Sequence, residues 1–262
     1  MAKRVGIPRG MFYYKFHPMW KTFFEELGIE LVVSDKTTRK IFDDGIKSCV
    51  DEACLPVKVF HGHVLNLKDR VDCIFIPRYT SISRKEYICP KFGGLPDMVR
   101  SSIKGLPCII DTEINLRNSK RNGFKAAVEI GSCFGCGRSE VRRAYHRALE
   151  NLAEYNACLR QGALASDIAD DWPLKRGSKR KESGGKKNIN IAVVGHCYNI
   201  YDSYVNMDML KKLKNMGVNI ITTEMVDEED INASVKGLHK KMFWNFGRFA
   251  VGAVNHLLRK GN

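Results

Sequence analysis

The sequence predicts an α/β protein with parallel sheets, divided into two units of which the second is incomplete. Three observations predict this class. Short apolar runs alternate with segments whose apolar residues recur at helical spacing, which is the pattern of a parallel sheet with helices on both faces. A basic run at 175–188 separates two such stretches by composition. Two strand-like runs follow it, which is too few for an independent sheet.

The first predicted unit covers residues 1–174 and opens with a strand over 3–8. A helix is expected over 17–27, because its apolar residues share one face and Gly28 is a typical residue after a helix end. The elements that follow are expected as strand 29–33, capping residues 34–38 with a helix to about 46, loop 49–54, helix 56–67, strand 73–76, loop 77–86, helix 95–103 and strand 107–110.

One long helix is predicted over 138–159. An apolar stripe runs along it, formed by Val141, Tyr145, Ala148, Leu152 and Tyr155. We interpret this stripe as a packing surface between domains or subunits, since nothing in it indicates a ligand site.

The second predicted unit covers residues 189–262, after a linker at 175–188. A buried strand over 191–195 leads into the loop 196–202, and open α/β sheets bind ligands at such carboxyl ends of strands. A helix to about 216, a strand over 218–222 and helices from 231 onward are expected to follow.

Composition limits the classes of function. The chain has 262 residues and a formal net charge of +14, and the run at 175–187 contributes +6 of it through seven Lys or Arg and one Glu. No run of about 18 apolar residues exists, so no transmembrane helix is expected. The N-terminus lacks the apolar core of a signal peptide, which predicts a cytoplasmic protein.

The positive charge by itself does not identify a partner. Nucleic acid is one explanation, but the sequence has no aromatic stacking motif and no zinc-finger spacing, so we consider it unlikely. Acidic partner proteins, the phosphates of a nucleotide-like ligand and a basic linker on a soluble surface explain the charge as well.

The chain has nine cysteines, an odd number that argues against a disulfide framework and in favour of metal binding or reactive thiols. Cys73 and Cys108 lie in apolar runs and are predicted to be core thiols. Cys158, on the long helix, is expected to have no role in a site.

Cys54 and Cys89 each stand at the start of a predicted helix, with proline one or two residues later. A thiolate there faces free backbone N–H groups and the positive end of the helix dipole, which lowers its pKa. Both helix starts follow strand–helix alternations and converge at the carboxyl edge of the sheet, so shared metal ligation is reasonable. The alternative is a pair of buried structural cysteines. Lys58 and Lys91 follow and would offset thiolate or phosphate charge.

Further metal ligands are sought among three other cysteines. Cys133 and Cys136 form a C-x-x-C motif between glycines, which occurs in zinc sites, clusters and redox pairs but also in plain turns. Cys197 is a candidate because of its strand-end loop, whereas Cys49 is a weaker one. His61 and His63 do not share a helix face, so they are interpreted as polar groups near a cleft or as structural histidines.

Several stretches together resemble the acyl-CoA dehydratase activase-related family, within the 2-hydroxyacyl-CoA dehydratase and benzoyl-CoA reductase subunit superfamily. They cover nearly the whole chain. They are 5–9, 20–28, Ala53-Cys54-Leu55-Pro56-Val57-Lys58, His61-Gly62-His63, Cys89-Pro90-Lys91-Phe92, 94–98 and 195–202.

This resemblance implies two Rossmann-like (flavodoxin-like) domains with a [4Fe-4S] or double-cubane iron–sulfur cluster in the cleft between them. It implies low-potential electron transfer, with an ATP-dependent activase as electron donor and a CoA thioester or other small molecule as substrate. Cys54 and Cys89 match two cluster cysteines of the family. Tyr198 and Asn199 are expected to approach from the second domain, opposite Lys58, Lys91 and the two histidines.

Two departures from the family pattern affect the predicted ligand set. Family members usually continue past Asn262 with a strand and a further cysteine element, and the usual Gly-His-Pro-Tyr-Asn here has Cys197 in place of proline. The missing ligand is therefore expected from Cys133, Cys136 or Cys197, from a second subunit or homodimer partner, or not at all. A split or truncated gene product would explain the shorter chain.

Three hypotheses follow. The first is an iron–sulfur protein of the dehydratase-subunit type. The second is a cluster-less regulatory or assembly module that binds a CoA-like or nucleotide ligand or the activase. The third and weakest is a zinc-stapled nucleic-acid-binding protein.

Overall fold

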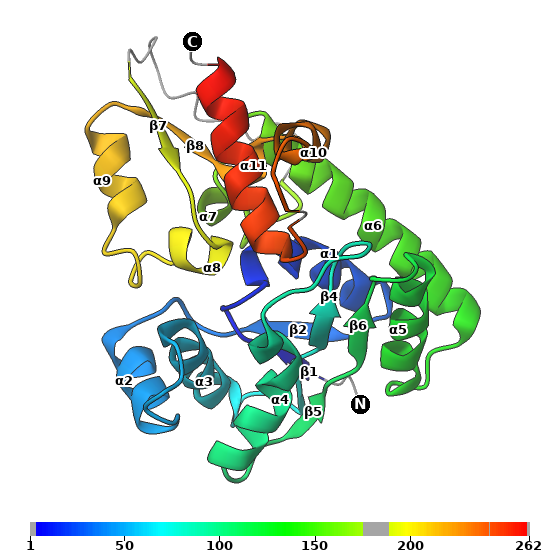
Figure 1. The fold of residues 1–262 in the computed structure, drawn as a ribbon. Helices are drawn as coiled ribbons and strands as arrows, with labels where there is room; N and C mark the ends of the chain where they lie inside the picture. Colours follow the sequence, from blue (N-terminus) through cyan, green and yellow to red (C-terminus); the bar gives the residue numbers. More distant parts are fainter. Residues whose placement is uncertain (1–3, 175–188, 241, 261–262) are drawn as a thin grey trace.

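The computed structural model describes residues 4–174, 189–240 and 242–260, so the predicted linker at 175–188 lies outside the described residues. The fold is α/β with parallel sheets, as predicted (Figure 1). In the described part, the main sheet has the parallel order β2 (Glu30–Val33), β1 (Arg4–Ile7), β3 (Cys73–Phe75) and β5 (Cys108–Ile110). The central strands β1 and β3 are almost fully buried, because helices cover both faces of the sheet.

The predicted loop at 77–86 was wrong in part, because it contains strand β4 (Arg78–Ser81). This strand pairs in parallel with β6 (Glu113–Asn115), which the sequence also did not reveal. Backbone bonds from Ile76 N to Ile110 O (3.0 Å) and from Arg78 N to Thr112 O (3.1 Å) join this pair to β3 and β5. The two short strands therefore continue the main sheet beyond Pro77, and such short mixed segments have no clear apolar periodicity.

Five of the six helices described next were predicted near their observed positions, whereas α5 was not predicted. Gly28 follows α1 with a φ of 70°, and the Thr38 hydroxyl caps α2 by accepting from Ile41 N. Helix α4 begins at Pro90, directly after Cys89 as the cysteine–proline pattern predicted, and so five residues before the helical segment expected over 95–103. These helices are α1 (Tyr13–Glu26), α2 (Arg39–Lys47), α3 (Leu55–Leu67), α4 (Pro90–Ser102), α5 (Arg121–Ser132) and α6 (Arg138–Arg160).

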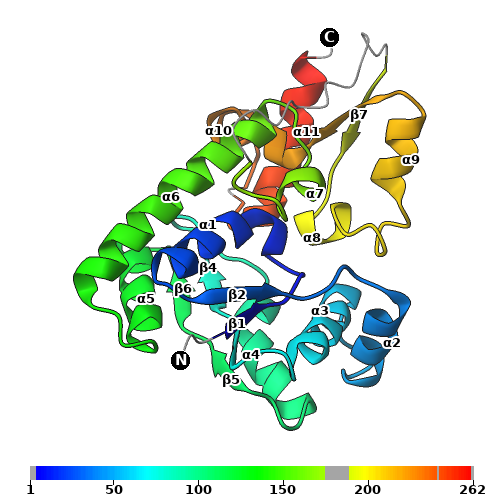
Figure 2. The ribbon, with the colours of Figure 1, turned by 180° about the vertical axis from the view of Figure 1, so that it is seen from behind.

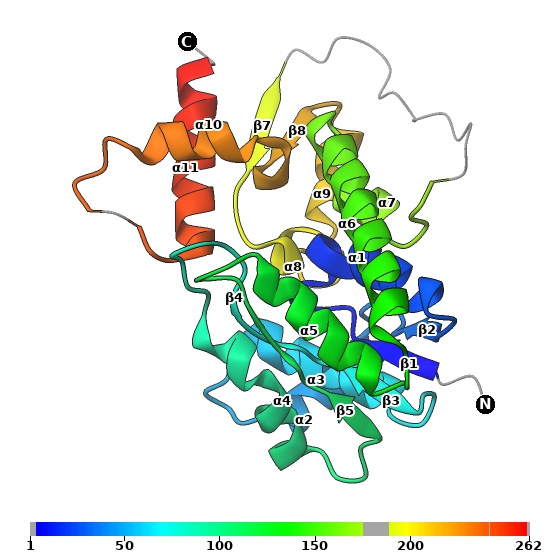
Figure 3. The ribbon, with the colours of Figure 1, turned by 90° about the vertical axis from the view of Figure 1, so that its right-hand side faces the viewer.

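Helix α6 confirms the predicted long helix. Its stripe residues Val141, Ala148 and Tyr155 are fully buried, and the helix packs along α1 (Figures 1 and 3). The Tyr155 hydroxyl donates to Tyr14 O at 2.9 Å. Although α6 has 23 residues, its outer face is charged, and no helix in the part of the chain described is long and apolar enough to cross a membrane.

The last part of the chain contains a separate parallel pair, β7 (Asn190–Val193) and β8 (Asn219–Thr222). The strand predicted over 191–195 is present as β7, but the prediction that it is buried was wrong. Residues of β7 alternate between exposed and half-buried, because β8 is its single neighbour among the described strands. The helical elements here are α8 (Cys197–Ile200), α9 (Met209–Asn215), the 3-10 turn η1 (Thr223–Met225), α10 (Glu228–Val235) and α11 (Asn245–Lys260), while the short α7 (Ala165–Ile168) precedes residue 175.

The core is shared between the two parts of the chain. Cys197, Ile200 and Tyr201 pack in the same apolar core as the main sheet, while Ile231 and Ala253 form a small second cluster under α10 and α11. Helix α10 crosses α11 on the outer side of this cluster (Figure 3). The division into domains at 1–174 and 189–262 stays a prediction.

The prediction that Cys108 is a core thiol was wrong. Cys73 on β3 is buried, but Cys108 is exposed. The two residues are paired in register, so the difference arises from the sheet order: β3 is central, whereas β5 is at the edge of the main sheet. Cys158 is half-buried.

Helices α2 and α3 approach closely through two glycines (Figure 2). A Cβ atom on Gly62 would lie 1.9 Å from Ile41 O, and one on Gly45 would lie 2.1 Å from Lys58 O. Gly62→Ala is therefore expected to destabilise the protein by about 3 kcal/mol, because the atom that the new Cβ would meet, Ile41 O, belongs to the backbone. Urea unfolding measures the loss. Gly94→Ala on α4, where the added atom meets nothing within 4 Å, should be neutral or stabilising, and equal effects would contradict the prediction.

Candidate functional site

Cys54 and Cys89 occupy equivalent positions in two consecutive helices. Each is the N-cap residue of its helix, α3 or α4, with proline in the first turn, so the predicted helix starts are confirmed. Helix α3 leads into β3 and α4 leads into β5, so both helices begin at the carboxyl edge of the main sheet. Both thiols are exposed, and neither caps its helix through a hydrogen bond.

Tyr198 approaches these thiols from the last part of the chain. It lies on α8, directly after β7, and its ring is 5.9 Å from that of Phe92. Burial raises the pKa of the Tyr198 hydroxyl, and the negative charge of Cys197, Cys89 and Cys54 as thiolates would raise it further. Both cysteines are therefore within electrostatic range of one phenol, which remains protonated at neutral pH. Asn199 lies in the same turn, where its N–H donates to His196 O at 2.8 Å.

Two lysines and a further cysteine lie beside Cys54. Burial raises the pKa of the Cys49 thiol, and the charges of Lys58 and Lys91 oppose this rise. The Lys58 ammonium donates to Asp51 O at 2.9 Å. Sequence reasoning gave Cys49 little weight, although its spacing of five residues from Cys54 was a usable signal. The structure adds it to the surroundings of Cys54, within electrostatic range of Lys58 and Lys91.

The C-x-x-C motif lies elsewhere. Helix α5 starts after β6 and runs back along the sheet, so Cys133 and Cys136 follow its end at the amino edge. The ring of Phe134 lies 6.0 Å from Phe24, near the end of α1, which also runs toward that edge. The Cys133 thiol donates to Glu129 O at 3.5 Å. The structure therefore does not bring these thiols together with Cys54 and Cys89.

Cys197 is close to the cysteine pair but is enclosed. Its side chain is 2% exposed, and the thiol donates to Met11 O at 3.7 Å. Burial, and to a lesser extent the Glu224 carboxylate, raises the pKa of this thiol to about 12. A neutral buried thiol is a poor metal ligand as it stands, because ligation requires the thiolate.

His61 and His63 are both buried, so neither lines an open surface. His61 Nδ1 is 2.8 Å from Val57 O. His63 Nδ1 is 3.0 Å from the Ser34 hydroxyl and its Nε2 is 3.0 Å from the Thr37 hydroxyl. Thr37 in turn donates to Asp202, next to the α8 turn. A neutral His63 ring satisfies this whole chain of hydrogen bonds, which ties α3 to the last part of the protein.

Two buried histidines are expected to make the protein sensitive to acid. Burial lowers the pKa of both His17 and His63 to about 3. The unfolded state binds their protons near pH 6.5 and the folded state does not, so stability is present above 6.5 and is lost as pH falls toward 3. We expect a loss of about 4 kcal/mol between pH 7.5 and pH 5 from the two rings together, measured by urea unfolding. Equal stability at both pH values would contradict this.

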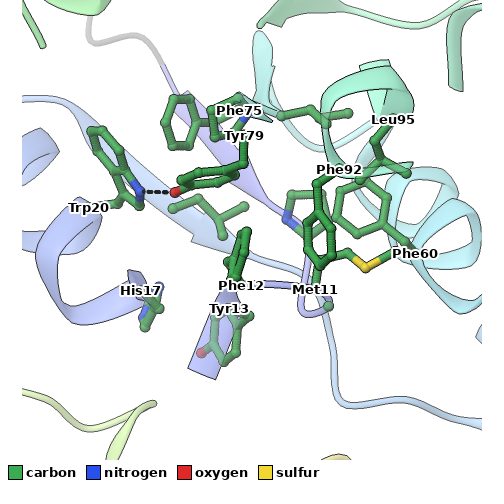
Figure 4. A pocket seen from close by; sticks show the side chains of 15 residues that line it. Met11, Phe12, Tyr13, His17, Trp20, Phe60, Phe75, Tyr79, Phe92 and Leu95 are labelled. Atoms are coloured by element: carbon green, nitrogen blue, oxygen red, sulfur yellow. Dashed lines mark hydrogen bonds between the residues drawn. The ribbon is translucent and has the colours of Figure 1, made fainter. Parts of the chain in front are cut away.

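Helices α3 and α4, which begin after Cys54 and Cys89, contribute to the walls of an apolar cavity of about 50 Å³ (Figure 4). Phe60 of α3 and Phe92 of α4 line one side, and Phe12, Trp20 and Tyr79 line another. The Trp20 indole donates to the Tyr79 hydroxyl at 2.8 Å, so both polar groups in this wall are satisfied. The helices that begin after Cys54 and Cys89 thus pack through Phe60 and Phe92 on an aromatic cluster.

Comparison with known proteins matches residues 4–226 to the model of one family, the CoA enzyme activase uncharacterised domain (DUF2229). The chain belongs to this family. No curated protein and no solved structure gave a significant match. The description of the family associates this domain with CoA enzyme activases. This agrees with the activase-related resemblance noted in the sequence.

The matched domain contacts a segment beyond residue 226 through the loop that precedes Cys89. Tyr87 N donates to Phe243 O and Asn245 N donates to Tyr87 O, both at 2.8 Å. Glu86, next to Tyr87, forms a buried ion pair with Arg248 of α11. We call these contacts between residues 86–87 and 243–248 the clamp. Nothing in the sequence indicated the clamp, because its two sides are about 160 residues apart and neither has a motif.

The donor set around Cys54 and Cys89 is incomplete as a metal centre. In the ranges 4–174, 189–240 and 242–260, no group of three or more His, Cys, Asp or Glu side chains is arranged to hold a metal ion. The domain therefore offers a pair of exposed thiols with cationic neighbours at one sheet edge.

Proposed function

We propose that this protein is an iron–sulfur protein that serves low-potential electron transfer or reductive chemistry, with Cys54 and Cys89 as cluster ligands. The observation that supports it most is the equivalent placement of two exposed thiols at the entrances of α3 and α4, both within electrostatic range of Tyr198. A [4Fe-4S] or double-cubane cluster takes Cys thiolates as its ligands.

The residues present would supply part of the ligand set and the positive surroundings of such a cluster. Helix N-termini and the ammonium groups of Lys58 and Lys91 favour anionic thiolates and the negative charge of a cluster. The described residues do not complete the usual four ligands. We propose that the others come from a second molecule, either another subunit or a second copy, or from Cys49 after a local rearrangement of the loop before α3.

Other side chains of the protein would bind the substrate and exclude water. A bound cluster would supply one-electron transfer at the sheet edge. Tyr198 stays protonated and would donate a hydrogen bond to a molecule bound beside the thiols. Phe92 and Phe246, whose rings are 6.1 Å apart, would limit the access of water from below. By family resemblance, an ATP-dependent activase is the proposed electron source and a CoA thioester the proposed substrate class.

Anaerobic reconstitution tests the proposal. The purified chain is incubated with ferrous iron and sulfide under reducing conditions, desalted, and analysed for bound iron, acid-labile sulfide and absorbance at about 400 nm. A brown protein with matched iron and sulfide is the expected result. A folded protein that retains neither element, alone or in the presence of an ATP-dependent activase, would overturn the proposal.

A second function is favoured by the incomplete ligand set. We infer as an alternative that the domain is a cluster-less regulatory or assembly module that binds a nucleotide-like ligand or an activase. A colourless, stably folded product that binds an activase after anaerobic preparation would support it. Bound iron and sulfide that depend on Cys54 and Cys89 would exclude it.

A further inference from the structure

Three large aromatic side chains are exposed together beside Cys89. Tyr87, Phe243 and Trp244 are 40%, 51% and 43% exposed, and we call these three residues the aromatic patch. The ring centres of Tyr87 and Phe243 are 6.4 Å apart, and those of Phe243 and Trp244 are 5.0 Å apart. Single exposed apolar residues are common on protein surfaces, but grouped aromatic rings are typical of interaction sites.

The backbone beneath the aromatic patch is held firmly. Tyr87 and Trp244 form a parallel β-bridge, and the two backbone hydrogen bonds of 2.8 Å flank it. Directly below, Arg248 pairs with Glu86, and Asn245 Nδ2 donates to Glu86 Oε2 at 2.7 Å. The rings are therefore presented on an ordered support, which lowers the entropy lost when a partner binds.

The rim of the aromatic patch is positively charged. Arg84, Lys85 and Arg117 are exposed, and Lys85 N donates to Arg117 O at 3.0 Å. The Arg117 guanidinium lies over the Tyr87 ring, 4.4 Å from its centre. The one carboxylate of the sequence between residues 78 and 96 is Glu86, which is buried against Arg248. A surface of this charge attracts an acidic partner.

The shape of the aromatic patch favours a protein over a nucleic acid. Single-stranded nucleic acids stack successive bases on open ring faces along a groove. Here the planes of Tyr87 and Phe243 cross at 85° and those of Phe243 and Trp244 at 41°, so the rings form a knob instead of a row of parallel faces. A knob of aromatic residues within a charged rim is typical of the centre of a protein interface.

We propose that the aromatic patch and its basic rim form the docking surface for an acidic redox protein, which acts beside the activase as a second electron donor to the site at Cys89. Cys89 is exposed two residues from Tyr87, so a protein docked there lies against the cysteine pair. The electron-donating role of this partner rests on the proposed function, whereas the docking itself does not require a bound cluster.

Binding of a purified bacterial ferredoxin, an acidic low-potential redox protein, to the iron-free chain tests the docking. Isothermal titration calorimetry is performed at about 0.05 M and at about 0.3 M salt. The higher salt concentration screens the attraction between charges and leaves the contacts of the aromatic rings largely unchanged. The double variant Phe243→Ala/Trp244→Ala is expected to raise Kd at least about tenfold at both salt concentrations. Lys85→Glu/Arg117→Glu is expected to raise Kd at low salt and to remove most of the salt dependence.

Matched controls come from α9 and the residue that follows it, away from the aromatic patch (Figure 1). Met216 is 71% exposed and Lys211 is exposed, so Met216→Ala and Lys211→Glu remove comparable groups outside the aromatic patch and should leave Kd within about twofold. Circular dichroism verifies that each variant is folded. The truncated side chains of Phe243 and Trp244 are exposed and their backbone bonds persist, so folding is expected.

Three results would overturn the docking proposal. They are no ferredoxin binding, equal Kd values for the wild type and both patch variants, and patch-dependent binding of an oligothymidylate in place of ferredoxin. Because the titration uses iron-free protein, its outcome is separate from reconstitution. Patch-dependent binding by a chain that assembles no cluster would refute the proposed function alone, and a cluster-bearing chain without such binding would refute the docking alone.

Discussion

Replacing Cys54 and Cys89 together by serine is expected to abolish the retention of iron and sulfide by the reconstituted protein. Serine keeps the size and the helix-capping position of each residue but replaces the thiolate that iron requires. Since two ligands are lost from one site, we expect residual iron below about a tenth of the wild-type amount. Colorimetric iron and sulfide determination after desalting measures the loss.

The matched control for this variant is Cys108→Ser. Cys108 is also exposed, but it starts β5 at the amino edge of the sheet, opposite the entrances of α3 and α4. It should retain the full content of iron. If the double variant binds as much iron and sulfide as the Cys108 variant, Cys54 and Cys89 are not the ligands. Cys49→Ser, measured in parallel, tests whether this neighbouring thiol takes part.

Replacing Arg248 by methionine is expected to cost about 3–5 kcal/mol of stability, the largest effect that we predict for a single substitution. The Arg248 side chain is 7% exposed and that of Glu86 is 10% exposed. Loss of the guanidinium leaves the Glu86 carboxylate buried, with Asn245 and the Ser83 hydroxyl as its remaining neighbours. Urea unfolding measures the change in the free energy of unfolding.

The same substitution should loosen the loop that presents Cys89. Hydrogen exchange of the Tyr87 and Asn245 amides, which bond across the clamp, is expected to become faster. Arg147→Met serves as the control, because Arg147 forms an exposed ion pair with Glu150 that contributes at most about 1 kcal/mol. A loss of less than about 1 kcal/mol for the Arg248 variant would show that the buried pair does not stabilise the clamp.

Local features of the site followed from short stretches of sequence. A cysteine followed by proline in the first helical turn predicted the starts of α3 and α4, and the alternation of strands with helices predicted that both starts lie at one sheet edge. The capping of α2 by Thr38 and the end of α1 at Gly28 are local in the same way. Such features depend on backbone hydrogen bonds within a few residues.

Other features were missed or mistaken because they depend on neighbours distant in the chain. Cys108 lies in an apolar run like that of Cys73, but the sheet order places it on an edge strand. The β7 strand has an apolar sequence, yet it is half-exposed because β8 is its one neighbour among the described strands. Hydrophobic periodicity indicates that a segment is a strand and does not indicate its place in a sheet.

The sequence by itself determined the α/β class, the helix entrances at Cys54 and Cys89, and the membership of a CoA enzyme activase-associated family. The tertiary structure decided which groups surround those entrances. It buried His63 and Cys197, separated the C-x-x-C motif from the cysteine pair, and joined Tyr87 to Trp244. The physical reason is that helix starts are fixed by neighbouring backbone groups, whereas burial and pairing are fixed by contacts between residues far apart in sequence.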